Sequence, residues 1–195
     1  MVVVASGYPT TMATHARDRL LDDTDGRFDT RGPRELGGPP APPRPWWPIL
    51  LYLAAVAAVA FLGSLATQSA VDTWYGELDK PWFTPPRWVF GPVWTVLYVM
   101  IAVSAFLTHR ARREAGGALA VWWVQLGLNL AWSLVFFGLR APVAGLVVIL
   151  ALLASIVVLI RSVWPVSRPA AWLLVPYALW VTYATALNIG IVAAG

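Results

Sequence analysis

Five long apolar stretches constrain the fold of this chain more than any other feature. Each is close to the ~20 residues that a helix needs to cross the hydrocarbon of a bilayer. None contains Asp, Glu, Lys or Arg away from its ends. The sequence therefore predicts an all-α membrane protein, a bundle of five transmembrane helices formed by residues 46–195. The predicted helices cover residues 46–68, 88–108, 119–139, 142–163 and 169–194.

The composition agrees with a protein that lies mostly in lipid. Charged residues make up only 12% of the chain, against about 25% in soluble domains. The sequence has no cysteine and only two histidines, so neither a thiolate nor a histidine metal site is expected. Its formal net charge of +4 comes mainly from arginines that flank the apolar stretches. They do not form one basic face, so nucleic acid is not an expected partner.

Residues 1–45 differ in composition from the rest of the chain. They combine five aspartates and six arginines with the run GGPPAPPRP. Mixed charge with few apolar residues cannot offset the entropy cost of ordering. We therefore expect a disordered N-terminal arm that ends in a stiff proline-rich spacer.

The distribution of positive charge predicts an orientation. The N-terminal arm and the loops 110–113 and 161–168 hold eleven of the Lys and Arg residues, and the opposite side holds three. By the positive-inside rule, the N-terminus is cytoplasmic, and the C-terminus and the loop 69–87 face outward. A helical bundle also suits an inner or plasma membrane better than an outer one.

The loop 69–87 is interpreted as a lid. It contains Lys80-Pro81 and Pro85-Pro86, which exclude regular helix because proline lacks an N–H donor and restrains the preceding residue. A loop rich in Trp, Pro and Gly beside a membrane helix is a poor flexible linker. The predicted lid residues are Trp74, Lys80, Pro81, Phe83, Pro85, Pro86 and Arg87.

Tryptophan is unusually frequent, at twelve residues in 195. Trp94, Trp132 and Trp180 lie deep in predicted helices, where an indole N–H needs a partner. The others near helix ends are interpreted as interfacial anchors, because indoles prefer the headgroup zone. This group comprises Trp46, Trp47, Trp88, Trp122, Trp123, Trp164 and Trp172.

Polar and aromatic residues form stripes at helical spacing on three predicted helices. Amides inside a bilayer must face protein, water or ligand. One interpretation is that the stripes join helices by hydrogen bonds that contribute roughly 0.6–2 kcal/mol each. The other, favoured by the coincidence of three stripes, is a cavity for a flat hydrophobic ligand between the second, third and fifth helices. The stripes are Trp94 and Tyr98; Gln125, Asn129, Trp132 and Phe136; and Tyr177, Trp180, Ala184 and Asn188.

No carboxylate or histidine lies at membrane depth in the predicted helices. The predicted helices therefore offer no obvious proton-transferring residues for a proton-coupled pump or an acid–base enzyme. Gly127 and Ala131 form a pair of small residues that would let a second copy approach closely, so a homodimer stays open.

The sequence resembles the translocator protein family, also called tryptophan-rich sensory proteins or peripheral benzodiazepine receptors. Three blocks carry the resemblance, in the family's order. They read WYGELDKPWFTPPRWVFGPVWTVLY at 74–98, QLGLNLAWSLVFFG at 125–138 and PYALWVTYATALN at 176–188. The resemblance spans essentially residue 46 to the C-terminus and leaves out the N-terminal arm.

The resemblance implies a five-helix bundle, often a homodimer, that binds porphyrins and other hydrophobic ligands under a lid. It implies ligand contacts at Trp94, Gln125, Asn129, Trp132, Trp180 and Ala184, with residues 80–87 supplying the lid. The stripes add Tyr98 and Tyr177 to the predicted ligand-binding residues. Porphyrin or haem is the expected ligand, and no cofactor is required.

Two departures from the animal members imply a bacterial-type member in a bacterial cell membrane, with a role in stress or tetrapyrrole regulation. After the last block the chain reads IGIVAAG, without the Tyr and Arg of the animal cholesterol-recognition motif. Ala144 stands where animal members have an additional cavity tryptophan. Two alternatives stay open: light- or oxygen-dependent breakdown of a bound porphyrin, and a scaffold whose stripes only join helices.

Overall fold

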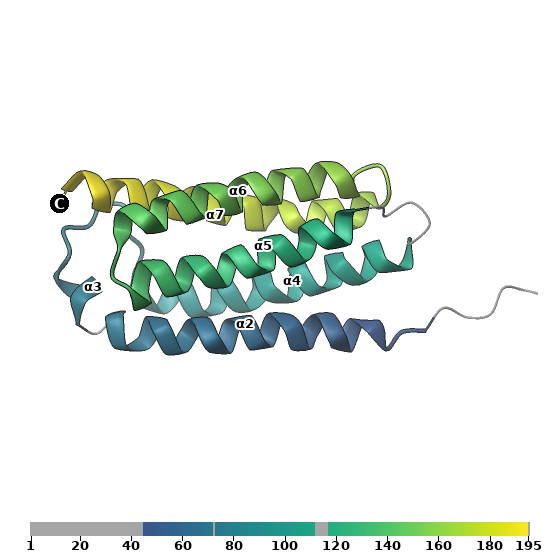
Figure 1. Ribbon diagram of the computed structural model, residues 1–195, viewed down its shortest axis with the longest axis horizontal. Coiled ribbons are helices and arrows are strands. Elements are labelled where there is room, and N and C mark those ends of the chain that lie inside the picture. The colour runs from purple at the N-terminus through teal and green to yellow at the C-terminus, as the bar shows by residue number, and fades with distance from the viewer. Residues whose placement is uncertain (1–44, 72, 112–116, 195) are drawn as a thin grey trace, which may run out of the picture. The chain divides into compact units, whose positions relative to one another are not determined.

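The computed structural model describes residues 45–71, 73–111 and 117–194, so residues 1–44 of the predicted arm lie outside it. Five of its helices are long and apolar enough to cross a membrane, and the described residues contain no strand. The predicted fold class is therefore confirmed (Figure 1). The long helices are α2 (Pro48–Val71), α4 (Phe90–Arg110), α5 (Ala118–Ser133), α6 (Pro142–Val163) and α7 (Arg168–Ala194), and the π-helical turn η2 (Leu134–Gly138) extends α5.

The predicted helix limits differ from the observed ones by at most three residues. The largest difference lies at the start of the predicted lid, because α2 continues to Val71. Two short helices, α3 (Trp74–Glu77) and the 3-10 turn η1 (Arg87–Val89), also lie within or next to it. Between them, residues 78–86 contain no helix, as their prolines predict. We use "lid strap" below for these residues 78–86.

The long helices close a ring in the order α2, α4, α7, α6, α5. Helix α2 packs against α4 and α5, α4 packs against α7, and α6 joins α5 to α7. Figure 1 shows α3 at the same end of the bundle as the C-terminus, with the starts of α5 and α7 at the other end. Lid strap and chain end therefore share one end of the ring.

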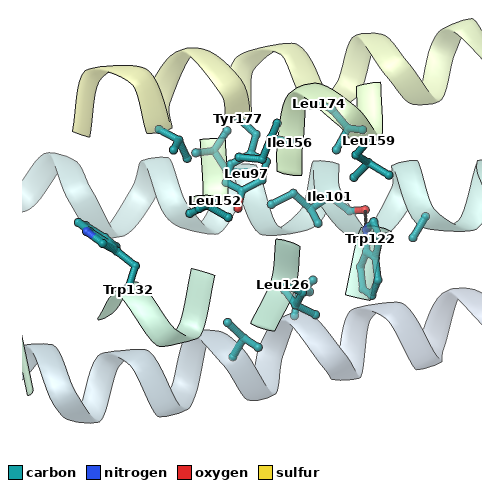
Figure 2. Close-up of a cluster of buried hydrophobic side chains, with 14 of the residues drawn as sticks. Leu97, Ile101, Trp122, Leu126, Trp132, Leu152, Ile156, Leu159, Leu174 and Tyr177 are labelled. Atoms are coloured by element: carbon teal, nitrogen blue, oxygen red, sulfur yellow. Dashed lines mark hydrogen bonds between the residues drawn. The ribbon is translucent and has the colours of Figure 1, made fainter. Parts of the chain in front are cut away.

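Most of the buried side chains inside this ring are apolar, and the described buried residues include no charged group. Ile101, Leu152, Ile156 and Leu174 have no exposed surface and lie together in the cluster of Figure 2. Hydrogen bonds from polar side chains to backbone carbonyls add specific links between helices. Thus Ser104 Oγ–H donates to the carbonyl of Ala170 at 2.8 Å and joins α4 to α7.

One of the seven tryptophans predicted to be interfacial lies in the core. Trp122 is 1% exposed, and its Nε1–H donates to the carbonyl of Ile101 at 3.1 Å (Figure 2). The prediction was wrong for Trp122, because distance from a helix end does not determine which side of the helix faces the bundle. Its neighbour Trp123 is 46% exposed, and Trp88 is 75% exposed.

Candidate ligand-binding site

A cavity of about 500 Å³ lies between α2, α4 and α5 at the lid end of the bundle. Helix α2 gives it small or weakly polar side chains, among them Gly63 and Ser64. Helix α4 gives it rings, and Trp132 and Phe137 close it from the α5–η2 side. The cavity is thus mostly apolar and aromatic, with a volume in the range of small-molecule sites.

Three rings of α4 form one wall of this cavity, and we refer to Phe90, Trp94 and Tyr98 as the α4 aromatic row. Their spacing of four residues places them on one face of the helix. The row also contacts α7. The ring centroids of Trp94 and Tyr177 lie 6.3 Å apart, and those of Phe90 and Trp180 lie 5.9 Å apart. The row therefore separates the cavity from the aromatic residues of α7.

This arrangement divides the predicted ligand-binding residues into two groups. Trp94, Tyr98 and Trp132 line the cavity. The other five do not: Gln125, Asn129, Tyr177 and Ala184 are buried, and Trp180 lines a separate, more open groove between α4 and α7. Ligand contact by these residues stays a prediction.

The observed cavity lies between the first, second and third spanning helices, whereas the stripes predict one between the second, third and fifth. Ala184 is one reason for the difference. A small residue was expected to leave room for a ligand, but at a helix interface it also lets backbones approach. Ala184 is only 7% exposed, so here it serves packing.

Two asparagines act as hydrogen-bonded links between helices. Asn129 Oδ1 accepts from Tyr98 Oη–H at 2.8 Å, and its Nδ2–H donates to Tyr177 Oη at 3.2 Å. Asn188 Nδ2–H donates to the carbonyl of Pro142 at 2.9 Å, and its Oδ1 accepts from Trp132 Nε1–H at 3.5 Å. The first joins α4, α5 and α7, and the second joins α5, α6 and α7.

Gln125 differs from these asparagines. Its side chain has no exposed surface, and neither amide atom has a hydrogen-bond partner among the described residues. Trp180 Nε1 is buried without a partner in the same way. A buried polar group left unsatisfied costs about 1–3 kcal/mol, so both residues require an explanation beyond helix packing.

Sequence reasoning missed the wall that α2 contributes. Ser64, Thr67 and Gln68 line the cavity near the C-terminal end of this helix. Three polar residues in five positions of an apolar helix were the available signal. This signal was weak, because serine and threonine hydroxyls in membrane helices often donate to a backbone carbonyl of the preceding turn. Thr67 Oγ1–H donates in this way to the carbonyl of Gly63 at 2.8 Å.

The lid strap is fixed to α7. Tyr183 Oη–H donates to the carbonyl of Phe83 at 2.7 Å. Pro81 lies directly against Gly190, where a Cβ atom would overlap the proline ring. Pro85 contributes to the α4–α7 groove beside Trp180. Three predicted lid residues lie elsewhere. The ring of Trp74 packs on that of Phe136, with the ring centroids 5.9 Å apart. Arg87 lines the cavity, and Pro86 is exposed.

Lys80 connects the lid strap to helix α3, which contributes Tyr75 to the cavity wall. Its Nζ donates to the carbonyls of Tyr75, Gly76 and Leu78 at 2.8–3.0 Å, and so caps the C-terminus of α3. Tyr75 itself lines the cavity. Burial raises the pKa of its phenol above the ordinary value, so the hydroxyl remains a neutral donor.

Replacing Lys80 with methionine should loosen α3 while leaving the bundle folded. Three charge-assisted hydrogen bonds are lost, and only the aliphatic stem is kept, so we expect local opening to become easier by about 2 kcal/mol. Hydrogen–deuterium exchange of residues 74–80 should then be roughly 30-fold faster. Asp79→Asn, at an exposed neighbour, is the control. Equal exchange in both variants would contradict the capping role.

Five spanning helices, three of which line an aromatic cavity, define an integral, multi-pass membrane protein. Residues 51–193 match the TspO/MBR family. The chain belongs to this family, which confirms the resemblance seen in its sequence.

Three relatives each align with 73–74% of the chain. Tryptophan-rich protein TspO of Archaeoglobus fulgidus is 42% identical over 144 residues, which cover 73% of this chain and 94% of the relative. The tryptophan-rich sensory protein of Cereibacter sphaeroides is 38% identical, covering 73% and 88%. The human translocator protein is 34% identical, covering 74% and 88%. The family and these names support a membrane receptor or translocator role.

Proposed function

We propose that this protein binds porphyrins, and tetrapyrroles such as haem, in the cavity between α2, α4 and α5. The observation that carries the proposal is the pair of indoles, Trp94 and Trp132, on the wall of an apolar cavity of about 500 Å³. Indole faces stack on flat aromatic ligands. A tetrapyrrole supplies such a face, together with a small number of polar groups.

The polar lining of the cavity suggests how such a ligand is oriented. Thr67, Gln68, Tyr75 and Arg87 line the end nearest the lid strap, and Trp132 and Tyr98 lie deeper. A guanidinium binds carboxylates in a fork geometry. The propionate groups of a porphyrin would therefore point toward Arg87, and the macrocycle would lie between the rings.

The proposal extends to the setting in which the protein acts. We place it in a bacterial cell membrane, because the sequence departs from the animal members at two places. We propose a cytoplasmic N-terminus, because the arginine-rich loops are predicted to lie on one side of the membrane. A sensory role fits the name of the Cereibacter sphaeroides relative, and we propose that it serves stress or tetrapyrrole metabolism. Homodimerisation through α5 is part of the same proposal, since Gly127 is exposed and a Cβ atom there would meet no described atom within 4 Å.

Trp94→Ala should weaken porphyrin binding about tenfold, because it removes one stacking face from the cavity wall. Binding is measured by titrating protoporphyrin into protein in lipid nanodiscs and following tryptophan fluorescence. Trp88→Ala is the matched control, since this indole lies on the neighbouring turn η1, is 75% exposed and is not part of the cavity. Equal affinities of the two variants would remove the stacking claim.

A further inference from the structure

The cavity between α2, α4 and α5 is partly open to the outside of the bundle, and the residues of α4 show where. Gly91 and Thr95 line the cavity and are also exposed. Because successive residues of a helix point about 100° apart, this pair lies between Trp94, on the cavity wall, and Val99. Val99 is 49% exposed and is not part of the cavity. The cavity wall on α4 therefore runs round to the apolar outer face of this helix.

The cavity wall on α2 ends in the same way. Ser64 and the exposed Gln68 line the cavity and lie, around the helix, between Thr67 and Phe61. Thr67 is part of the cavity wall, whereas Phe61 is 63% exposed and lies outside the cavity. On both helices the cavity thus reaches an exposed apolar face, which in a spanning helix is the face toward lipid.

Helices α2 and α4 are neighbours in the ring, so these two edges of the cavity face each other. At the end of the bundle away from the lid strap the two helices are in direct contact, with Tyr52 Oη 2.9 Å from His109 Nδ1. Toward the lid strap, the cavity lies between them. Both edges belong to spanning segments, Pro48–Gln68 and Arg87–Arg110, so the opening is at membrane depth. We refer to the four residues of these edges as the side mouth of the cavity: Ser64, Gln68, Gly91 and Thr95.

The side mouth is chemically suited to contact with hydrocarbon. Ser64 Oγ–H donates to the carbonyl of Phe61 at 2.8 Å, and Thr95 Oγ1–H donates to the carbonyl of Gly91 at 2.9 Å. Both hydroxyl protons are therefore paired within their own helices and leave no free donor toward lipid. Gly91 has no side chain to obstruct the opening. A flat apolar molecule can pass such an edge without breaking a hydrogen bond between helices.

The end of the cavity nearest the lid strap is covered instead. Tyr75 of α3 lines the cavity and is buried. Arg87, the first residue of η1, reaches across to α3, because a Cβ atom at Gly76 would lie only 3.0 Å from its Nη2. Side chains of α3 and η1 therefore stand between the cavity and water, and Lys80 ties α3 to the lid strap.

We propose that the cavity opens to the hydrocarbon through the side mouth, and that its ligand enters from the membrane and not from water. This inference rests on the proposed function for the identity of the ligand. It selects flat molecules that dissolve in the bilayer and keep their carboxylates at the headgroup level, since a charge in hydrocarbon is costly. Arg87 begins its spanning segment and so lies near that level. A porphyrin that moves sideways would bring its propionates to Arg87 and its ring to Trp94 without turning over.

Closing the side mouth with a covalent bridge tests the route. The sequence contains no cysteine, so Ser64→Cys and Thr95→Cys together can be joined by a bismethanethiosulfonate reagent of matched length. In lipid nanodiscs the bridge should slow protoporphyrin binding and release at least about tenfold, because it obstructs the passage, and leave their ratio, the affinity, unchanged. The control is the same double variant treated with methyl methanethiosulfonate, which modifies both thiols without joining them. Equal exchange rates in the two preparations would overturn entry through the side mouth while leaving porphyrin binding intact.

The direction of the opening is tested without any ligand. A nitroxide spin label at Thr67→Cys, on the cavity wall, is compared with one at Leu65→Cys, on the exposed face of α2. Molecular oxygen concentrates in hydrocarbon, whereas a nickel chelate stays in water. At both positions oxygen should relax the label several-fold more than the chelate does. At position 67, relaxation mainly by the chelate, or by neither reagent, would overturn the side mouth whether or not porphyrin binds.

Discussion

Gly190→Ala should detach the lid strap from α7. The new Cβ atom would occupy the position of the Pro81 ring, and neither a proline ring nor the backbone of a helix can move aside locally. Overpacking of this kind costs ~1–3 kcal/mol. Hydrogen–deuterium exchange of residues 82–84 should therefore accelerate by roughly 5- to 150-fold, and bound porphyrin should dissociate faster.

Gly127→Ala is the matched control for this substitution. Both glycines lie inside long helices, so alanine gives the same gain in helix propensity, about 1 kcal/mol. At Gly127, however, a Cβ atom would meet nothing within 4 Å among the described residues. Exchange of the lid strap should therefore be unchanged in this variant. Normal exchange in Gly190→Ala would mean that Pro81 is not seated against α7.

The contacts of the lid strap explain why its release should reach the ligand site. Pro81 and Phe83 fix the strap to α7. The adjacent Lys80 donates a hydrogen bond to the carbonyl of Tyr75, and Tyr75 lines the cavity. Detaching Pro81 therefore disturbs Lys80 and, through it, Tyr75. The strap acts on the cavity through α3, although it is attached on the opposite side of the α4 aromatic row.

Trp122→Ala should lower the free energy of unfolding by about 3–5 kcal/mol, whereas Trp123→Ala should change it by less than about 1 kcal/mol. Trp122 is 1% exposed and donates to the carbonyl of Ile101, so its loss leaves a large void in the core and removes a hydrogen bond between α5 and α4. Trp123 is 46% exposed and leaves no comparable void. Unfolding of both variants is measured in the same detergent or bilayer. Equal destabilisation would contradict the assignment of Trp122 to the core.

This pair of tryptophans also shows where reasoning from sequence reached its limit. Neighbouring residues on a helix point about 100° apart, so one of them faces the bundle and the other faces away from it. Sequence position identified both as close to a helix end. Only the packing of α5 against its neighbours shows that Trp122 is the buried one.

The amides of α5 show the same limit. Gln125 and Asn129 lie on one stripe of the helix, and their helical spacing shows that they share a face. Whether such an amide joins helices or remains available depends on which side chains stand opposite. Tyr98 and Tyr177 stand opposite Asn129, while Gln125 has no partner among the described residues.

By itself, the sequence determined the five spans, their limits to within three residues and the lack of regular helix around the prolines at 81, 85 and 86. These features depend on local chemistry: hydrocarbon requires backbone groups to pair within a continuous apolar helix, and proline prevents that pairing. The tertiary structure alone decided that α2 forms a cavity wall, that Ala184 serves packing and that Tyr98 lines the cavity while bonded to Asn129. These features depend on the rotation and distance of helices far apart in the chain, and the periodicity of a single helix carries no information about either.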